Sequence, residues 1–160
     1  MLELEEIKKQ LMKGKTIESI LGQSDWKNFE AIIAKVFEEN NFHTILNFRF
    51  KTKNRFEIDI IAIKGNDVFC VDCKWWNTGR YKKTRLKNAI TKQEKRLKEF
   101  RKFIKKNLIA KKTMKIDQDS NFYTLIVTLL EEDLLKENET IVVPAWKLNA
   151  FLMDIDSYIE

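Results

Sequence analysis

The sequence predicts an α/β fold in which a central mixed β-sheet is flanked by helices. Three stretches carry this prediction: residues 55–76 resemble a β-hairpin, residues 84–107 a long amphipathic helix, and residues 121–130 a continuous apolar run. A run of that kind is typical of a strand buried on both faces, whereas the hairpin must be antiparallel. We therefore expect a core ordered helix, three strands, helix, strand, with extra helices near both ends.

Length and composition indicate a single domain of 160 residues, because Gly and Pro are scarce and 44% of the residues are hydrophobic. We place the core at residues 24–130, N-terminal helices within 1–23, and a C-terminal strand and helix within 131–160. Residues 1–10 are charged and lack the apolar core of a signal peptide. The expected location is therefore cytoplasmic.

The first core helix is expected over residues 25–40, with Ser24 as its N-cap. Its apolar stripe contains one acid, Glu30, and a buried acid requires a partner. Glu30 is thus either a site residue or a residue at the edge of the stripe. The apolar members of the stripe are Trp26, Phe29, Ile33, Val36 and Phe37.

A strand over residues 42–53 precedes the hairpin, whose turn is expected at residues 65–67. Strict alternation would place Asp59 on the same side of its strand as Glu57, Ile61 and Ile63. On the second strand, Asp72 and Lys74 would share a side with Val68 and Cys70. Pairing of the two strands would then bring Asp59 close to Asp72 and Lys74.

Carboxylates at contact distance on a buried surface are costly, because burial and mutual repulsion both disfavour their charged forms. A divalent cation bound by carboxylate oxygens removes the repulsion, as in Mg²⁺ sites. The alternative is that these acids face water at the edge of the sheet. The hairpin alone does not decide between the two.

The long helix has one polar residue, Gln93, in a stripe that otherwise consists of Leu86, Ile90, Leu97, Phe100 and Ile104. An inward glutamine is either part of a site or satisfied by backbone groups alone. Residues 80–115 hold 16 Lys and Arg but only Glu94 and Glu99 as acids, a local charge of +14, whereas the rest of the chain carries −8. This asymmetry favours a polyanionic partner such as nucleic acid over an ordinary solvated helix face.

The remaining segments indicate structure only. We expect a polar connection over residues 111–119, a helical or loop excursion over 131–138, a short strand over 140–143 and a final helix over 145–158. Cys70 and Cys73 would point to opposite faces of their strand, which suits neither a disulfide nor a shared zinc ion. We interpret both cysteines and His43 as packing or surface residues.

The order of these elements and their polar residues resembles the PD-(D/E)xK nuclease superfamily, in particular its Mrr-type restriction endonuclease and archaeal Holliday-junction resolvase branches. The motif residues would fall on Glu30, Asp59, Asp72 and Lys74, and Gln93 would match a helical glutamine of some branches. Two departures stand out: Ile58 replaces the proline before the first aspartate, and the usual Glu-x-Lys is Asp72-Cys73-Lys74. The resemblance implies a restriction-endonuclease-like fold.

The resemblance also implies Mg²⁺- or Mn²⁺-dependent hydrolysis of DNA phosphodiester bonds, as in a restriction or repair endonuclease. Asp59, Asp72 and the backbone carbonyl of Cys73 would bind the metal, and Glu30 a second ion or a metal-bound water. Lys74 would act on the attacking water, and Gln93 would position Lys74 or that water. Residues expected to bind DNA are Arg80, Lys82, Lys83, Arg85, Lys92, Lys95 and Arg96.

Two alternatives stay open. The protein could be a structure-selective Holliday-junction resolvase, which would act as a homodimer because two symmetric cuts require two sites. It could instead be a non-catalytic DNA-binding module on the same fold. Trp75 and Trp76 follow the lysine directly, and one of them could stack on a base, or both could be core residues.

Overall fold

A computed structural model describes residues 6, 9, 13, 26–74, 82–117, 119–129 and 135–159. The expected helices within residues 1–23, the Ser24 cap, Trp75, Trp76 and Arg80 lie outside the described residues. The side chains of Trp26 and Lys82 are likewise not described, although the backbone of each belongs to a helix.

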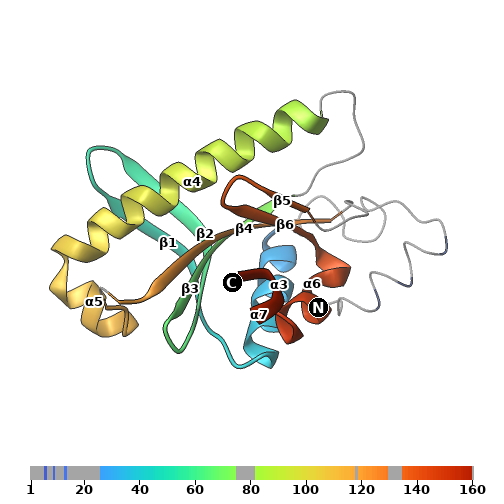
Figure 1. Cartoon of the computed structure of the whole chain (residues 1–160), viewed down its shortest axis with the longest axis horizontal. Coiled ribbons are helices and arrows are strands. Elements are labelled where there is room, and N and C mark those ends of the chain that lie inside the picture. Colours follow the sequence, from blue (N-terminus) through green and yellow to red (C-terminus); the bar gives the residue numbers. More distant parts are fainter. Residues whose placement is uncertain are drawn as a thin grey trace.

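The described chain contains one mixed sheet flanked by helices, which confirms the predicted fold class (Figure 1). The sheet has six strands in the order β1-β2-β3-β4-β6-β5. β3 pairs antiparallel with β2 and parallel with β4, so the sheet changes direction at β3. The elements are α3 (Trp26–Glu39), β1 (His43–Lys51), β2 (Arg55–Lys64), β3 (Asp67–Lys74), α4 (Lys82–Lys106), α5 (Leu108–Met114), β4 (Asn121–Thr128), β5 (Leu135–Glu137), β6 (Thr140–Pro144), the 3-10 helix η1 (Ala145–Lys147), α6 (Leu148–Met153) and α7 (Asp156–Ile159).

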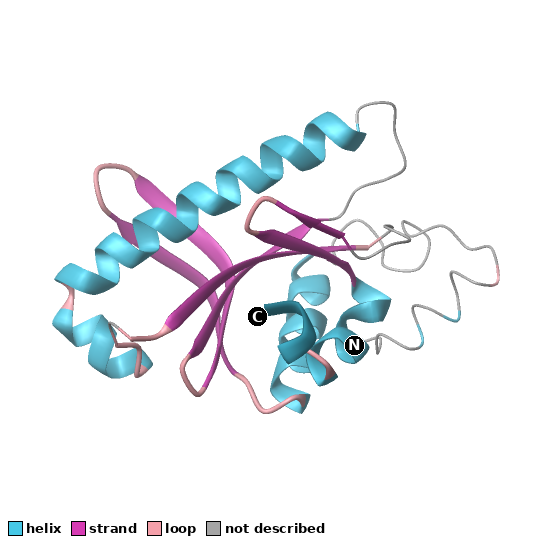
Figure 2. Ribbon diagram, viewed as in Figure 1, coloured by secondary structure: helices cyan, strands magenta, loops and turns pink. Residues whose placement is uncertain are grey.

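Two faces of the sheet are covered by different helices, as the ribbon in Figure 2 shows. On one face, α3 and α6 pack on a core that includes Phe29, Phe69 and Phe151. On the other face, α4 covers a core that includes Phe100 and Ile104. Since each α4 residue of the expected stripe is buried or partly buried, the helical periodicity predicted this packing correctly.

The hairpin forms at the predicted place, with Lys64 paired to Asp67 across a two-residue turn. Gly65 has φ of +58°, a conformation that glycine adopts without the steric penalty of a Cβ. Asn66 does not have a positive φ, and this combination is the pattern of a type II′ turn, whose twist matches that of the two strands.

Three expected segments differ from the structure. The polar connection over residues 111–119 is partly helical, because local caps and not an apolar stripe determine α5. At its start, the Asn107 side chain accepts a hydrogen bond from the Ala110 N–H, and at its end Lys115 has a left-handed backbone with φ of +56°. The excursion over residues 131–138 contains the edge strand β5. The final helix is divided into η1, α6 and α7.

Candidate metal and acid site

The pleat of β2 is interrupted at Asp59, and this interruption positions the site. Ile58 lies in the same core as Ile61 and Ile63, although strict alternation would put it on the opposite face. In the adjacent strand, Asn47 has φ of +51°, and the regular pairs on either side of it leave Asn47 and Asp59 unpaired. An irregularity of this kind re-aims a side chain. The expectation that Asp59, Ile61 and Ile63 share one side is therefore wrong.

The re-aimed Asp59 carboxylate bonds to the neighbouring strand. The regular β2–β3 pairs end at Ile60 and Val71, and beyond them the Cys73 N–H donates to Asp59 Oδ2 at 2.9 Å. A side chain thus takes the place of a backbone acceptor where the two strands separate. The pKa of Asp59 is raised from 3.8 to about 7: burial is the largest cause, the negative charges of Asp72 and Glu30 add to it, and the hydrogen bond from the Cys73 N–H opposes it.

Asp72 lies in the middle of the sheet, on β3, with 4% of its surface exposed. Lys74 Nζ lies 3.0 Å from its Oδ2, and an Arg96 nitrogen lies 3.4 Å from its Oδ1. The lysine does not approach Oδ2 with hydrogen-bond geometry, so that this buried oxygen has no hydrogen-bond partner. A buried carboxylate oxygen without a donor is an uncommon and costly arrangement, which a bound cation would relieve.

Glu30 reaches the same region from α3, and only 6% of its surface is exposed. Its negative charge contributes to the raised pKa of Asp59 and, with Asp59 and Asp72, to that of the Cys73 thiol, which burial already raises well above its usual range. The three acids that the sequence singled out therefore all lie within electrostatic range of Cys73. Among the described residues, however, no three Cys, His, Asp or Glu side chains are gathered into a ready-made metal-binding group.

The residues present nevertheless fit a magnesium ion. Mg²⁺ in proteins is held by one or two carboxylates and keeps several waters, so it does not require a complete protein cage. Asp59 and Asp72 supply two carboxylates from strands that separate at this point, and Asp72 supplies an oxygen without a donor.

Gln93 is buried, with 1% of its surface exposed, and both ends of its amide are in use. Its nitrogen donates to the Cys70 carbonyl oxygen at 2.7 Å, and its oxygen accepts from Arg96 at 3.2 Å. Gln93 thus connects the backbone of β3 to Arg96, which in turn contacts Asp72. The structure shows Gln93 bonded to Arg96, and the expectation that it positions Lys74 or the attacking water stays a prediction.

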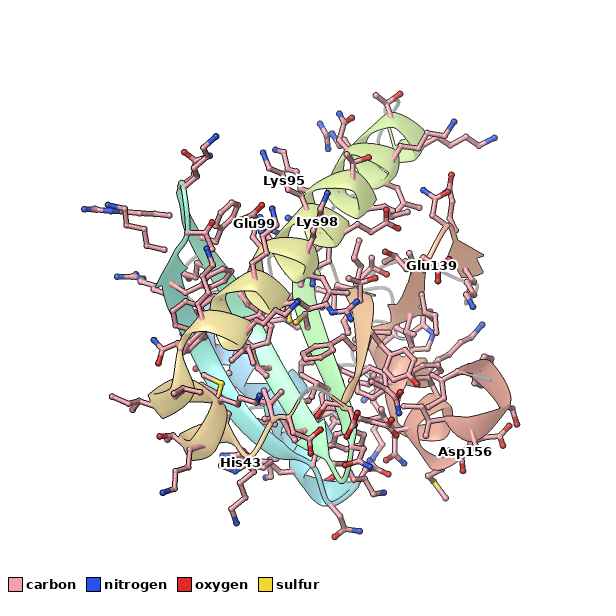
Figure 3. All side chains as sticks on the ribbon, turned by 60° about the vertical axis from the view of Figure 1, so that its left-hand side comes forward. His43, Lys95, Lys98, Glu99, Glu139 and Asp156 are labelled. Carbon is pink, nitrogen blue, oxygen red and sulfur yellow. The ribbon has the colours of Figure 1, made fainter. Side chains whose placement is uncertain are left out.

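The residues expected to bind DNA are placed in two groups. Lys83, Arg85, Lys92 and Lys95 are exposed on α4, and Figure 3 shows Lys95 and Lys98 extending from the outer side of that helix. Arg96 is different, because three-quarters of its side chain is covered and it contacts the acids. Sequence reasoning found Arg96 but missed this position; its spacing of three residues from the inward Gln93 was the available signal.

Of the other polar residues, Cys73 bonds to Asp59 through its N–H, whereas Glu57 pairs elsewhere. Glu57 is partly exposed and pairs with Arg49 at 2.8 Å, an arrangement that gives it no contact with the site. Cys70 and Cys73 are both buried and unbonded, and they lie in the cores on opposite faces of the sheet, as alternation predicts. His43 is exposed at the start of β1. Its placement agrees with a surface residue.

Fold and site together define an α/β domain with a cluster of carboxylates, flanked by two cations, at an irregular point in its sheet. A family model described as the nuclease-related domain (NERD) matches residues 25–129. The chain therefore belongs to the nuclease-related domain family. The matched range contains each of the five core positions discussed above, from Glu30 to Gln93.

Three individual proteins are similar to this chain. An uncharacterized protein of Archaeoglobus fulgidus is 27% identical over 135 residues, which are 84% of this chain and 94% of that protein. The crystal structure of a protein of unknown function overlaps 80% of this chain and 65% of its own, with 14% identity and a TM-score of 0.47. The small subunit of the heterodimeric restriction endonuclease R.BspD6I overlaps 98% of this chain and 76% of its own, with 16% identity and a TM-score of 0.49. At these TM-scores neither structure indicates what this chain does.

No helix within the described ranges is long and apolar enough to cross a membrane.

Proposed function

We propose that the protein is a metal-dependent DNA endonuclease that hydrolyses phosphodiester bonds. One observation supports this most directly: Asp72 is a buried carboxylate that pairs with Lys74 at 3.0 Å and lies within electrostatic range of Asp59. Membership of a nuclease-related family agrees with it. The finer resemblance, to the Mrr-type and resolvase branches of the PD-(D/E)xK superfamily, is part of this proposal.

In this proposal Asp59, Asp72 and the Cys73 carbonyl oxygen would hold Mg²⁺ or Mn²⁺, and Glu30 would hold a second ion or a water. The metal would supply Lewis acidity and lower the pKa of its bound water. Lys74, next to Asp72, would orient the attacking water and offset negative charge on the phosphate. Arg96 is a second cation at that place, and Gln93 fixes its guanidinium by the bond at 3.2 Å.

DNA would be held largely by its backbone. The exposed lysines and arginines of α4 would contact phosphates, which gives affinity without sequence discrimination. The basic outer face of α4 is expected to make DNA binding strongly dependent on salt concentration. A homodimer is part of the resolvase alternative, because resolvase activity would require two symmetric sites.

The proposal is tested by a cleavage assay with Mg²⁺ or Mn²⁺ on duplex, single-stranded, flap and four-way-junction DNA and on duplex RNA. We expect cleavage of DNA that EDTA abolishes and that Asp72→Asn and Lys74→Ala each lower by at least about 100-fold, with binding retained. Glu57→Gln, at an acid of the neighbouring strand β2 that pairs with Arg49, is the control and should leave the rate unchanged.

The outcomes separate the candidate functions. Preference for the junction over linear duplex would indicate a resolvase. Metal-independent binding without any cleavage, together with no Mn²⁺ binding by calorimetry, would indicate a non-catalytic module and would contradict the endonuclease proposal. Cleavage that persists in both variants would also contradict it.

A further inference from the structure

A groove away from the acid site lies between the β1–β2 hairpin loop and the C-terminal half of α4. It has a volume of about 510 Å³. Its lining includes Thr52 on the hairpin side and Phe103 on the helix side. Four exposed lysines surround it, against a single acid, which gives a net charge of +3. These lysines are Lys51, Lys53, Lys102 and Lys106.

The acid of the groove, Glu99, is used structurally. One of its oxygens accepts a hydrogen bond from the Thr52 hydroxyl at 2.5 Å, and the other pairs with Lys102 at 3.2 Å. Glu99 therefore ties the hairpin loop to α4 and fixes the width of the groove. Figure 3 shows Glu99 on the side of α4 where the hairpin lies. Because Glu99 is already bonded to Thr52 and paired with Lys102, the groove presents a positive surface to a ligand.

The elements next to the groove, α4 and β2, also carry Arg96 and Asp59 of the acid site. Along α4, Glu99 follows Arg96 by one helical turn on the same face, and Lys106 lies about 15 Å beyond Arg96 at ~1.5 Å per residue. On the hairpin side, Lys51 pairs with Arg55, which lies four residues before Asp59 along β2, or about 13 Å at ~3.3 Å per residue. A ligand that extends from the acids along these two walls would therefore meet the lysines of the groove.

The chemistry of the lining indicates which kind of ligand fits. Single-stranded nucleic acid is usually held by exposed aromatic rings on which bases stack. Phe103 is half-buried and packs against Phe48 and Phe50, so this ring does not offer such a platform. Flexible lysines around a groove are suited to phosphate oxygens as point charges.

We propose that this groove binds the sugar–phosphate backbone of the duplex arm that extends from the cleavage site. The inference rests on the proposed function and adds a polarity to it: one arm of the substrate is held and the other is not. At ~3.4 Å per base pair, the distances of about 13 Å along β2 and about 15 Å along α4 correspond to about four base pairs. Arms shorter than this would not reach the groove.

The test measures binding without cleavage, in EDTA, by fluorescence anisotropy of end-labelled duplexes. One series of duplexes has 5 to 30 base pairs. The variant Lys53→Gln/Lys102→Gln/Lys106→Gln removes three charges from the groove. The control variant Lys64→Gln/Lys115→Gln/Lys136→Gln removes three exposed charges from other elements. Thermal unfolding followed by circular dichroism verifies that both variants are folded.

We expect the groove variant to weaken binding to long duplexes and to lower the slope of log affinity against log salt by about 2 to 3, at ~0.9 per phosphate contact. It should bind the shortest duplexes as the wild type does, and the control variant should show neither effect. Equal losses in both variants, equal losses at all lengths, or the absence of any length dependence in the wild type would overturn the proposal.

The outcome is separate from that of the nuclease proposal. Length-dependent binding through the groove without metal-dependent cleavage would keep the groove and contradict the endonuclease. If the groove variant cleaves DNA and binds long duplexes with unchanged affinity, the endonuclease proposal is kept and the groove proposal is contradicted.

Discussion

The substitution Asp59→Asn should stabilise the metal-free protein at pH 8. The pKa of Asp59 is raised from 3.8 to about 7, chiefly because the carboxyl group is buried. Between pH 4 and pH 7 the folded state therefore retains a proton that the unfolded state has lost, and stability decreases as the pH rises through this window. At ~1.36 kcal/mol per pKa unit, a shift of that size is equivalent to at most about 4 kcal/mol.

The expected gain is smaller than this ceiling. Because Asp59 is partly exposed, solvent screens its charge, so we expect Asp59→Asn to raise the free energy of unfolding by about 2 kcal/mol at pH 8. At pH 5 the gain should be less than half as large, because folded wild type is then mostly protonated at this residue. The asparagine oxygen can still accept the Cys73 N–H.

Urea unfolding in EDTA at pH 5 and pH 8 measures this difference. Glu57→Gln is the control, since Glu57 pairs with Arg49 at the surface, and it should change the free energy of unfolding by less than about 0.5 kcal/mol at either pH. In the wild type, Mg²⁺ at ten times its dissociation constant should add about 1.4 kcal/mol, and in Asp59→Asn clearly less. A variant that is no more stable than the wild type at pH 8 would refute the reasoning.

Two further predictions concern Arg96 and the core under α4. Arg96→Ala should tighten Mn²⁺ binding in calorimetry by a few-fold, since one cation no longer competes for Asp72, while lowering cleavage. Lys136→Ala, which removes an equal exposed charge from β5, should do neither. Unchanged Mn²⁺ affinity in Arg96→Ala would contradict the contact with Asp72. Phe100→Ala should lower the free energy of unfolding in urea by about 3 to 5 kcal/mol, because Phe100 is fully buried. The control Leu108→Ala, at a residue that is 75% exposed, should lower it by less than about 0.5 kcal/mol. Comparable losses in the two variants would show that the core is assigned incorrectly.

Much of the site could be predicted because its parts have local signals. A hairpin with a glycine turn and two apolar stripes, each with one polar residue, fixed which elements carry Glu30, Asp72 and Gln93. Burial of these three is what their positions in the stripes predict. Their catalytic roles stay predictions, since proximity and burial show where a group lies but not what it does.

Other features could not be predicted because their causes are not local. The direction of the Asp59 side chain depends on the irregular pairing with Asn47, and an asparagine that tolerates a left-handed backbone is only a weak sign of it. α5 begins with two exposed apolar residues, Leu108 and Ile109, and therefore lacks helical periodicity. The strand β5 has three residues, and its existence depends on β6 as a partner.

The long helix α4 is a single rod that serves two surfaces at once. Its outer side carries the cations that a polyanion would contact, and its inner side is hydrogen-bonded to β3 through Gln93, which donates to the Cys70 carbonyl oxygen. A displacement of the rod along its axis would carry Gln93 and Arg96 together past Asp72. A ligand that displaced α4 would therefore be expected to change the contact between Arg96 and Asp72.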